Sequence, residues 1–235
     1  MTDNKTSTKY FVTTAIDYIN GKPHIGHSYE KVAADVLARF HRAKIGAENV
    51  RFLTGTDEHG AKIEDYAKDS GLEIQEFADK TSAGFKFAWD NLNISYDRFI
   101  RTTDADHNKV VEDTLTKIKE NGFLYEADYE GLYCVGHEAF LTEKDLVDGL
   151  CPDHKKAPEL IKEKNWFFKV SEFTATIKEK IENDEFKIYP LSAKKEILSM
   201  LDEGFKDIAA TRPNVKWGIP VPWDKEQTIY VWVDA

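Results

Sequence analysis

The stretch Pro23-His24-Ile25-Gly26-His27 stands between residues 10–16, which are rich in β-forming side chains, and a helical pattern that begins directly after it. A helix that starts at such a turn presents unpaired backbone N–H groups and the positive end of its dipole to an anion. The two histidines add hydrogen-bond donors, and Gly26 lets a phosphate or a flat base approach the backbone. The stretch therefore predicts an α/β fold with a phosphate site at this turn.

A second polar cluster, Thr54-Gly55-Thr56-Asp57-Glu58-His59-Gly60, follows the strand predicted at residues 49–53. In an open parallel sheet, the carboxyl ends of the strands line the ligand crevice. His24 and His27 could instead serve only as caps of the following helix, and for a single histidine that alternative is the stronger one. Two polar clusters at two strand ends favour a binding site.

Hydrophobic periodicity predicts strands that alternate with helices. In the helix that follows the first turn, these apolar residues recur at helical spacing and are expected to pack on a sheet: Tyr29, Val32, Ala33, Val36, Leu37 and Phe40. Further helices are expected at residues 61–69, 77–92 and 110–118, with a strand at 98–100. This alternation implies a parallel sheet with right-handed crossovers.

Both cysteines of the chain lie in a later region of short aromatic strands and turns. Cys134, His137, Cys151 and His154 form the spacing C-x2-H-x13-C-x2-H, which fits four ligands of a tetrahedral zinc ion. Four protein ligands leave no open position, so we expect one structural Zn²⁺. The alternative is a pair of free buried cysteines beside incidental histidines, since a disulfide is less expected in the cytosol.

Five motifs occur in a fixed order along the chain: residues 13–21 (TTAIDYING), 23–27 (PHIGH), 54–60 (TGTDEHG), 217–222 (WGIPVP) and 230–235 (YVWVDA). Together they resemble the methionyl-tRNA synthetases of class I, and the resemblance runs from Lys9 to the last residue. It implies an α/β fold in which a Rossmann-like parallel sheet is interrupted by a small α+β connective insertion with a zinc-knuckle-like motif.

The resemblance also divides the chain. It implies that residues 1–121 are the first half of the catalytic domain, residues 122–223 the connective insertion with the knuckle at 134–154, and residues 224–235 the start of the second half. Within this last part, the strand that re-enters the sheet is expected at 228–233. Complete members of the family continue through a KMSKS-type loop and an anticodon-binding domain, which these residues do not contain, so we expect the fragment alone to be inactive.

The activity implied by the resemblance is ATP-dependent activation of L-methionine to methionyl-adenylate, followed by transfer to tRNA(Met). ATP with Mg²⁺ is then a substrate. The implied catalytic residues are His24, His27 and Arg212, and the implied ATP contacts are His24, Gly26 and His27. The implied methionine pocket consists of Ile16, Tyr18, Asp57, Trp232 and Ala235. Two alternatives stay open: a class I synthetase for another apolar amino acid, and a non-catalytic binding protein derived from a synthetase.

The knuckle departs from the family pattern at one ligand. Related enzymes with a single knuckle usually have a cysteine where this chain has His137. The spacing is kept, but only two thiolates remain, so we expect a lower metal affinity.

Composition limits the partners. The net charge is −10, with 42 acidic and 32 basic residues, which argues against a general electrostatic grip on nucleic acid. Contacts with tRNA would therefore use local basic patches, and DNA is not an expected partner. No apolar run approaches the roughly 20 residues that span a bilayer, and residues 1–8 are polar without a signal-peptide core. We expect a cytoplasmic protein with no membrane partner.

Overall fold

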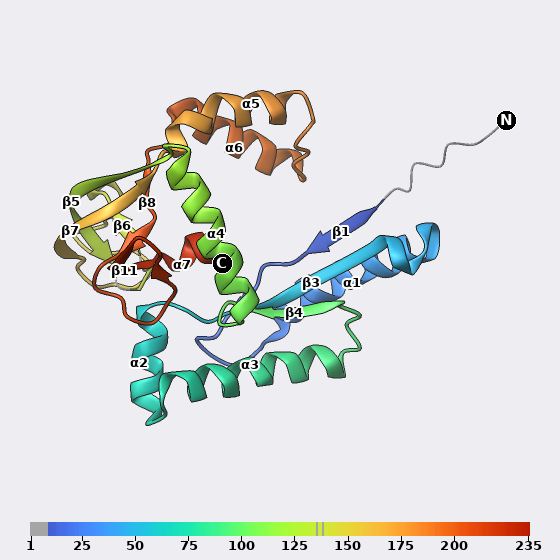
Figure 1. The fold of residues 1–235 in the computed structure, drawn as a ribbon. Coiled ribbons are helices and arrows are strands. Elements are labelled where there is room, and N and C mark those ends of the chain that lie inside the picture. The colour runs from blue at the N-terminus through green and yellow to red at the C-terminus, as the bar shows by residue number, and fades with distance from the viewer. Residues whose placement is uncertain (1–8, 135, 138) are drawn as a thin grey trace.

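The computed structural model describes residues 9–134, 136–137 and 139–235. The prediction for residues 1–8 therefore lies outside the described residues. A parallel sheet with long helices forms one part of the molecule, and antiparallel strands form another part beside it (Figure 1). Helix α4 (Ala105–Glu120) runs from the first part to the second.

The parallel sheet is built around one long strand, β3 (Val50–Asp57). Strand β4 (Arg98–Arg101) pairs with one side of β3. Strands β1 (Tyr10–Thr13) and β2 (Asp17–Tyr18) pair with its other side, β1 near the start of β3 and β2 at its end. These two strands are thus two pieces of one sheet edge, separated by residues 14–16. The expected parallel sheet is confirmed, and it is interrupted where the chain leaves β1.

The helices predicted from the periodicity are present: α1 (Ile25–Ile45), α2 (Ala61–Ser70), α3 (Ile74–Asn91) and α4. Helix α2 ends at Gly71, whose φ of +70° is a left-handed C-cap and whose N–H donates to the carbonyls of Ala67 and Lys68. The core between sheet and helices includes Phe52 and Trp89, both fully buried. None of the described helices is both long and apolar enough to cross a membrane.

The helix predicted after the phosphate turn is correct, but its predicted buried face is wrong. Tyr29, Val36 and Phe40 are 79%, 60% and 59% exposed. The buried residues of α1 are instead Lys31, Ala34, Asp35 and Ala38. Small alanines allow α1 to lie close to the sheet, and the charged residues among them bond to neighbouring segments. The Asp35 carboxylate, for example, accepts the backbone N–H of Ser95 at 2.7 Å.

The antiparallel part consists of two sheets. The larger has the order β6-β5-β7-β8 and is dominated by the long pair β5 (Leu124–Cys134) and β7 (Glu159–Phe168). Its shorter strands are β6 (Ala139–Leu141) and β8 (Ile208–Ala209). The smaller sheet has the order β10-β11-β9, with β9 at Thr211–Arg212, β10 at Pro220–Val221 and β11 at Asp224–Ile229. Helices α5 (Thr174–Glu182) and α6 (Leu191–Glu203) project from one end of this part (Figure 1).

The strand expected at residues 228–233 is only partly correct. Strand β11 ends at Ile229, and residues Val231–Asp234 form a short helix, α7. Strand β11 pairs antiparallel with β9 and β10, not with the parallel sheet. The β-branched pattern suggested a continuous strand, but the N–H groups of Val233 and Asp234 both bond to the carbonyl of Tyr230, which turns the chain into a helix.

Glu58 anchors the loop that follows β3. Its side chain is 0% exposed and accepts two hydrogen bonds from the Arg101 guanidinium, at 2.7 and 2.8 Å. The hydroxyls of Thr56 and Thr103 donate to the same carboxylate at 2.6 and 2.7 Å, and the Trp217 indole N–H donates to the Glu58 carbonyl at 2.6 Å. These bonds satisfy a buried charge and fix the loop that carries Asp57 and His59.

We expect Glu58→Ala to lower the free energy of unfolding by about 3–5 kcal/mol, because it leaves Arg101 without its buried partner. Urea denaturation measures this loss. The matched control is Asp79→Ala, which removes a half-exposed partner of the same guanidinium, bonded at 2.7 Å. That variant should cost less than about 1 kcal/mol. Equal losses for the two variants would contradict the role of Glu58 as the buried anchor.

Candidate active site

A cavity of about 740 Å³ lies where β1 and β2 separate, at the carboxyl end of β3. The five residues expected to bind methionine all line this cavity: Ile16, Tyr18, Asp57, Trp232 and Ala235. Two come from the interrupted sheet edge, one ends β3, and two come from α7 and the residue after it. The structure thus brings residues 16–18, Asp57 and residues 232–235 to one cavity, while the contacts of these side chains with a substrate stay a prediction.

Helix α7 is held beside the cavity by a hydrogen bond to a histidine. The Asp234 side chain is 0% exposed, and its Oδ2 lies 3.1 Å from Nδ1 of His59, in the loop after β3. Its Oδ1 lies 3.7 Å from Nε2 of His107, on α4, which is too far for a hydrogen bond. This attachment places Trp232 and Ala235 at the cavity, where the Trp232 side chain is 71% exposed.

His24 and His27 cap the N-terminus of α1. Nδ1 of His24 accepts the N–H of Gly26 at 3.1 Å, and Nδ1 of His27 accepts the N–H of His24 at 3.2 Å. The two rings stack with centroids 3.7 Å apart. A Cβ on residue 26 would approach the His24 ring to 2.9 Å, so glycine permits this cap. The structure therefore shows that both histidines cap the helix, and their contact with a phosphate stays a prediction.

Capping leaves both histidines able to donate. Since each Nδ1 accepts a backbone hydrogen bond, the neutral ring carries its proton on Nε2. Burial lowers the pKa of His27, and the nearby Asp17 carboxylate opposes that change. A neutral ring with an Nε2–H donor beside a helix N-terminus is suited to an anionic oxygen. Neither histidine is among the residues that line the 740 Å³ cavity.

Arg212 lies apart from that cavity. Its guanidinium stacks over the Tyr230 ring, with the carbon 3.9 Å from the ring centroid, and Nη1 donates to the carbonyl of Thr211 at 2.9 Å. Arg212 and Tyr230 line a smaller neighbouring pocket that also contacts Trp217. The structure therefore does not place Arg212 with the other predicted site residues, and its catalytic role stays a prediction.

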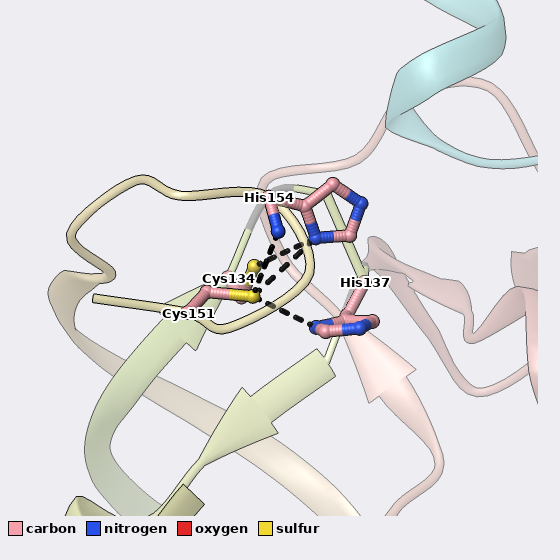
Figure 2. Close-up of side chains that lie close together, drawn as sticks. All are labelled: Cys134, His137, Cys151 and His154. Atoms are coloured by element: carbon pink, nitrogen blue, oxygen red, sulfur yellow. Dashed lines mark hydrogen bonds between the residues drawn. The ribbon is translucent and has the colours of Figure 1, made fainter. Parts of the chain in front are cut away.

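The four predicted metal ligands do meet. Figure 2 shows Cys134, His137, Cys151 and His154 facing one another, and their ligand atoms all lie within 4.8 Å. Cys151 Sγ is 3.5 Å from Nδ1 of His137 and 3.4 Å from Nδ1 of His154. The remaining thiol, on Cys134, is 3.7 Å from the same nitrogen of His154. This cluster of two sulfurs and two imidazoles can hold a metal ion.

The surroundings of the cluster fit metal binding. Although burial raises the pKa of the Cys151 thiol, hydrogen bonds from the backbone of His154 and Asp153 lower it overall, which favours the thiolate. The Asp153 carboxylate lies 2.9 Å from Nε2 of His137, an arrangement that directs Nδ1 toward the ligand cluster. A Cβ on Gly136 would approach the His154 ring to 2.3 Å, so glycine allows the turn to close.

Among the lining residues that were not predicted for the cavity, three carry ionisable side chains: Lys62, His107 and His137. Lys62 and His107 each follow the carboxyl end of a parallel strand, β3 and β4 respectively, so the rule that strand ends line the ligand crevice could have found them. His137 also lines the cavity, although it was predicted only as a metal ligand. No local signal could have placed it there, because the approach depends on how the insertion packs.

Comparison with known families gives a consistent result. The sequence model described as "tRNA synthetases class I (M)" matches residues 10–158 and 154–235. Curated methionine–tRNA ligases are similar along almost the whole chain. That of Deinococcus radiodurans is 44% identical over 97% of the chain and 34% of its own length, and that of Streptomyces coelicolor is 41% identical over 100% and 45%. The chain thus spans less than half the length of these relatives.

Solved structures agree. Mycobacterium tuberculosis methionyl-tRNA synthetase bound by methionyl-adenylate matches with a TM-score of 0.89 and 38% identity, over 96% of this chain and 45% of that one. The free-state structure of the same enzyme matches with a TM-score of 0.78 and 35% identity, over 97% of this chain and 44% of that one. These matches confirm the expected fold, a parallel catalytic sheet with an insertion. The chain belongs to the class I methionyl-tRNA synthetase family.

Proposed function

We propose that the protein of which this chain is part activates L-methionine with ATP and transfers it to tRNA(Met). The observation that carries the proposal is the convergence of five predicted methionine contacts on one cavity at the carboxyl end of the sheet. In the first step a methionine carboxylate oxygen attacks the α-phosphorus of Mg²⁺·ATP, and the bond to pyrophosphate breaks. In the second step a terminal ribose hydroxyl of tRNA attacks the adenylate carbonyl, and AMP leaves.

No enzyme nucleophile is required, because positioning and charge stabilisation can supply the rate. We assign Asp57 to the substrate ammonium and Ile16, Trp232 and Ala235 to the thioether, whose polarisable sulfur suits an apolar aromatic wall. Tyr18 completes the wall. The Nε2–H donors of His24 and His27 are assigned to the phosphate oxygens, and Gly26 to the adenine. Arg212 is assigned to the reacting centre, which requires its guanidinium to leave the Tyr230 ring.

We also propose the division of the chain into residues 1–121, 122–223 and 224–235, as the first catalytic half, the insertion and the start of the second half. The change from parallel to antiparallel strands after α4 supports the first boundary. Leu115 of α4 nevertheless packs in one core with Leu124, Ile219 and Ile229, so the insertion shares its interior with the end of the first part.

The experiment that tests the activity is methionine-dependent exchange of pyrophosphate into ATP, using the uninterrupted reading frame that contains these residues. Leucine, isoleucine, valine, cysteine and homocysteine form the comparison panel. Strongest exchange with methionine supports the proposal. Strongest exchange with another amino acid would indicate a synthetase of different specificity, and no exchange with any of them would favour a non-catalytic binding protein.

Two substitutions should separate the phosphate site from the methionine site. His27→Ala is expected to lower kcat about 10²- to 10³-fold with little change in methionine KM, because it removes a donor to the transferring phosphoryl group. Asp57→Ala should chiefly raise methionine KM. Steady-state exchange kinetics measure both. His41→Ala, about 21 Å along the same helix, and Asp65→Ala, on α2, serve as controls and should change neither constant. An unaltered rate in His27→Ala would remove that residue from the mechanism.

We propose that the Cys134–His137–Cys151–His154 cluster holds one structural Zn²⁺, which supports the insertion and takes no part in the reaction. Elemental analysis of purified protein should find about one zinc per chain, and none in Cys151→Ser. His137→Cys should bind zinc more tightly, because a third thiolate replaces an imidazole. Zinc content that is unchanged by Cys151→Ser would contradict the assignment. A chelator should lower the melting temperature of the wild-type protein, but not that of the serine variant.

A further inference from the structure

Lys31 is a buried lysine on the sheet-facing side of α1. Its side chain is 0% exposed, and its ammonium lies 5.8 Å from the centroid of the buried Trp89 ring. An ammonium group in such a place costs several kcal/mol unless each of its N–H groups has a partner. Three acceptors surround it: Asp17 Oδ1 at 2.7 Å, the Ala15 carbonyl at 2.9 Å and Glu30 Oε2 at 3.0 Å. The donor capacity of the ammonium is therefore fully used.

These contacts hold the interrupted sheet edge. The Ala15 N–H donates to Glu30 Oε1 at 2.8 Å, while the Ala15 carbonyl accepts from Lys31. Both backbone polar groups of Ala15 are thus bonded to consecutive side chains of α1. In the adjoining strands β1 and β2, backbone groups bond to β3 instead. At Ala15, where the cavity opens, hydrogen bonds to side chains of α1 therefore take the place of the backbone hydrogen bonds to a neighbouring strand.

The segment held in this way is a wall of the cavity. Ala15, Ile16 and Tyr18 all line it. Asp17, between the last two, points away from solvent, and its side chain is 3% exposed. Its Oδ2 has no hydrogen-bond partner among the described residues. Burial raises the pKa of Asp17, and the adjacent Lys31 ammonium opposes that change. The Lys31–Asp17 pair thus joins the wall of the cavity to α1.

A merely structural role would not need these charges. Replacement of a buried ion pair by apolar side chains of similar volume is often neutral or stabilising. The geometry indicates what a lysine offers here that a methionine cannot. An apolar side chain could fill the same space, but it could not donate to the Ala15 carbonyl or to Asp17 Oδ1.

We propose that Lys31, together with Glu30 and Asp17, is a positioning group that fixes the Ala15–Tyr18 wall of the methionine cavity. The inference rests on the proposed function for its kinetic consequence. Its structural consequence, an ordered Ala15 peptide, is independent of which substrate occupies the cavity. Lys31 does not itself touch the substrate.

The first test compares Lys31→Met with wild type in the uninterrupted reading frame. Methionine KM should rise about tenfold or more, the scale of losing a hydrogen bond to a charged group. Amide hydrogen exchange across residues 14–18 should accelerate by a similar factor, because the Ala15 carbonyl then keeps only the adjacent Thr14 hydroxyl as a donor, at 2.8 Å, and α1 holds the segment through Glu30 alone. Arg42→Met is the matched control: it breaks a salt bridge to Asp97, at 2.7 Å, on the same helix. It should lower stability without changing either quantity.

Two further variants keep the proposal testable if Lys31→Met fails to fold. The double variant Asp17→Asn, Lys31→Met leaves no unpaired buried charge, so it should regain stability while methionine KM and amide exchange stay raised. Glu30→Ala removes the acceptor of the Ala15 N–H and should also accelerate amide exchange at Ala15. Wild-type methionine KM and wild-type exchange at residues 14–18 in the double variant would overturn the proposal. Absence of methionine-dependent exchange in the wild type would instead overturn the proposed function, and the amide exchange would still decide the positioning role.

Discussion

The interruption of one sheet edge between β1 and β2 is the constraint on which the site depends. Along the rest of β3, neighbouring strands satisfy the backbone, but Ala15 lies outside that ladder and needs other partners. Glu30 and Lys31 supply them from α1. The same interruption leaves the space of the cavity at the carboxyl end of the sheet. The space for a ligand and the buried charges beside it therefore have one structural cause.

This requirement also decides how α1 is oriented. Hydrophobicity alone would turn Val36 and Phe40 toward the sheet, yet they are exposed and Lys31 and Asp35 are buried. Burial of Lys31 with all of its hydrogen bonds made is favoured over burial of Val36 and Phe40. The opposite orientation of α1 would leave backbone groups of the sheet edge without hydrogen-bond partners. The outer face of α1 therefore exposes apolar side chains such as Val36 and Phe40. An exposed apolar face favours contact with another protein segment or aggregation.

The parts of the structure that could be predicted from the sequence are those with a local physical signal. The helix after the phosphate turn and the strand before Asp57 follow from hydrophobic periodicity and strand-end composition. The face of α1, the helical turn at Val231–Asp234 and the cavity position of His137 could not be predicted in this way. Each depends on segments distant in sequence: Lys31 on Asp17, Asp234 on His59, and His137 on how the insertion packs.

The cavity is consequently a joint product of segments that lie far apart in the chain. His59 and Asp234 are 175 positions apart, and their contact brings α7 to the loop after β3. His137 of the knuckle approaches the same cavity from the insertion, and Leu115 of α4 shares a core with that insertion. Val233 of α7 packs against the same cluster as Leu115, while the core beneath the parallel sheet forms a second cluster around Phe52 and Trp89. The walls of the cavity are therefore supported from two cores, one beneath the parallel sheet and one shared with the insertion.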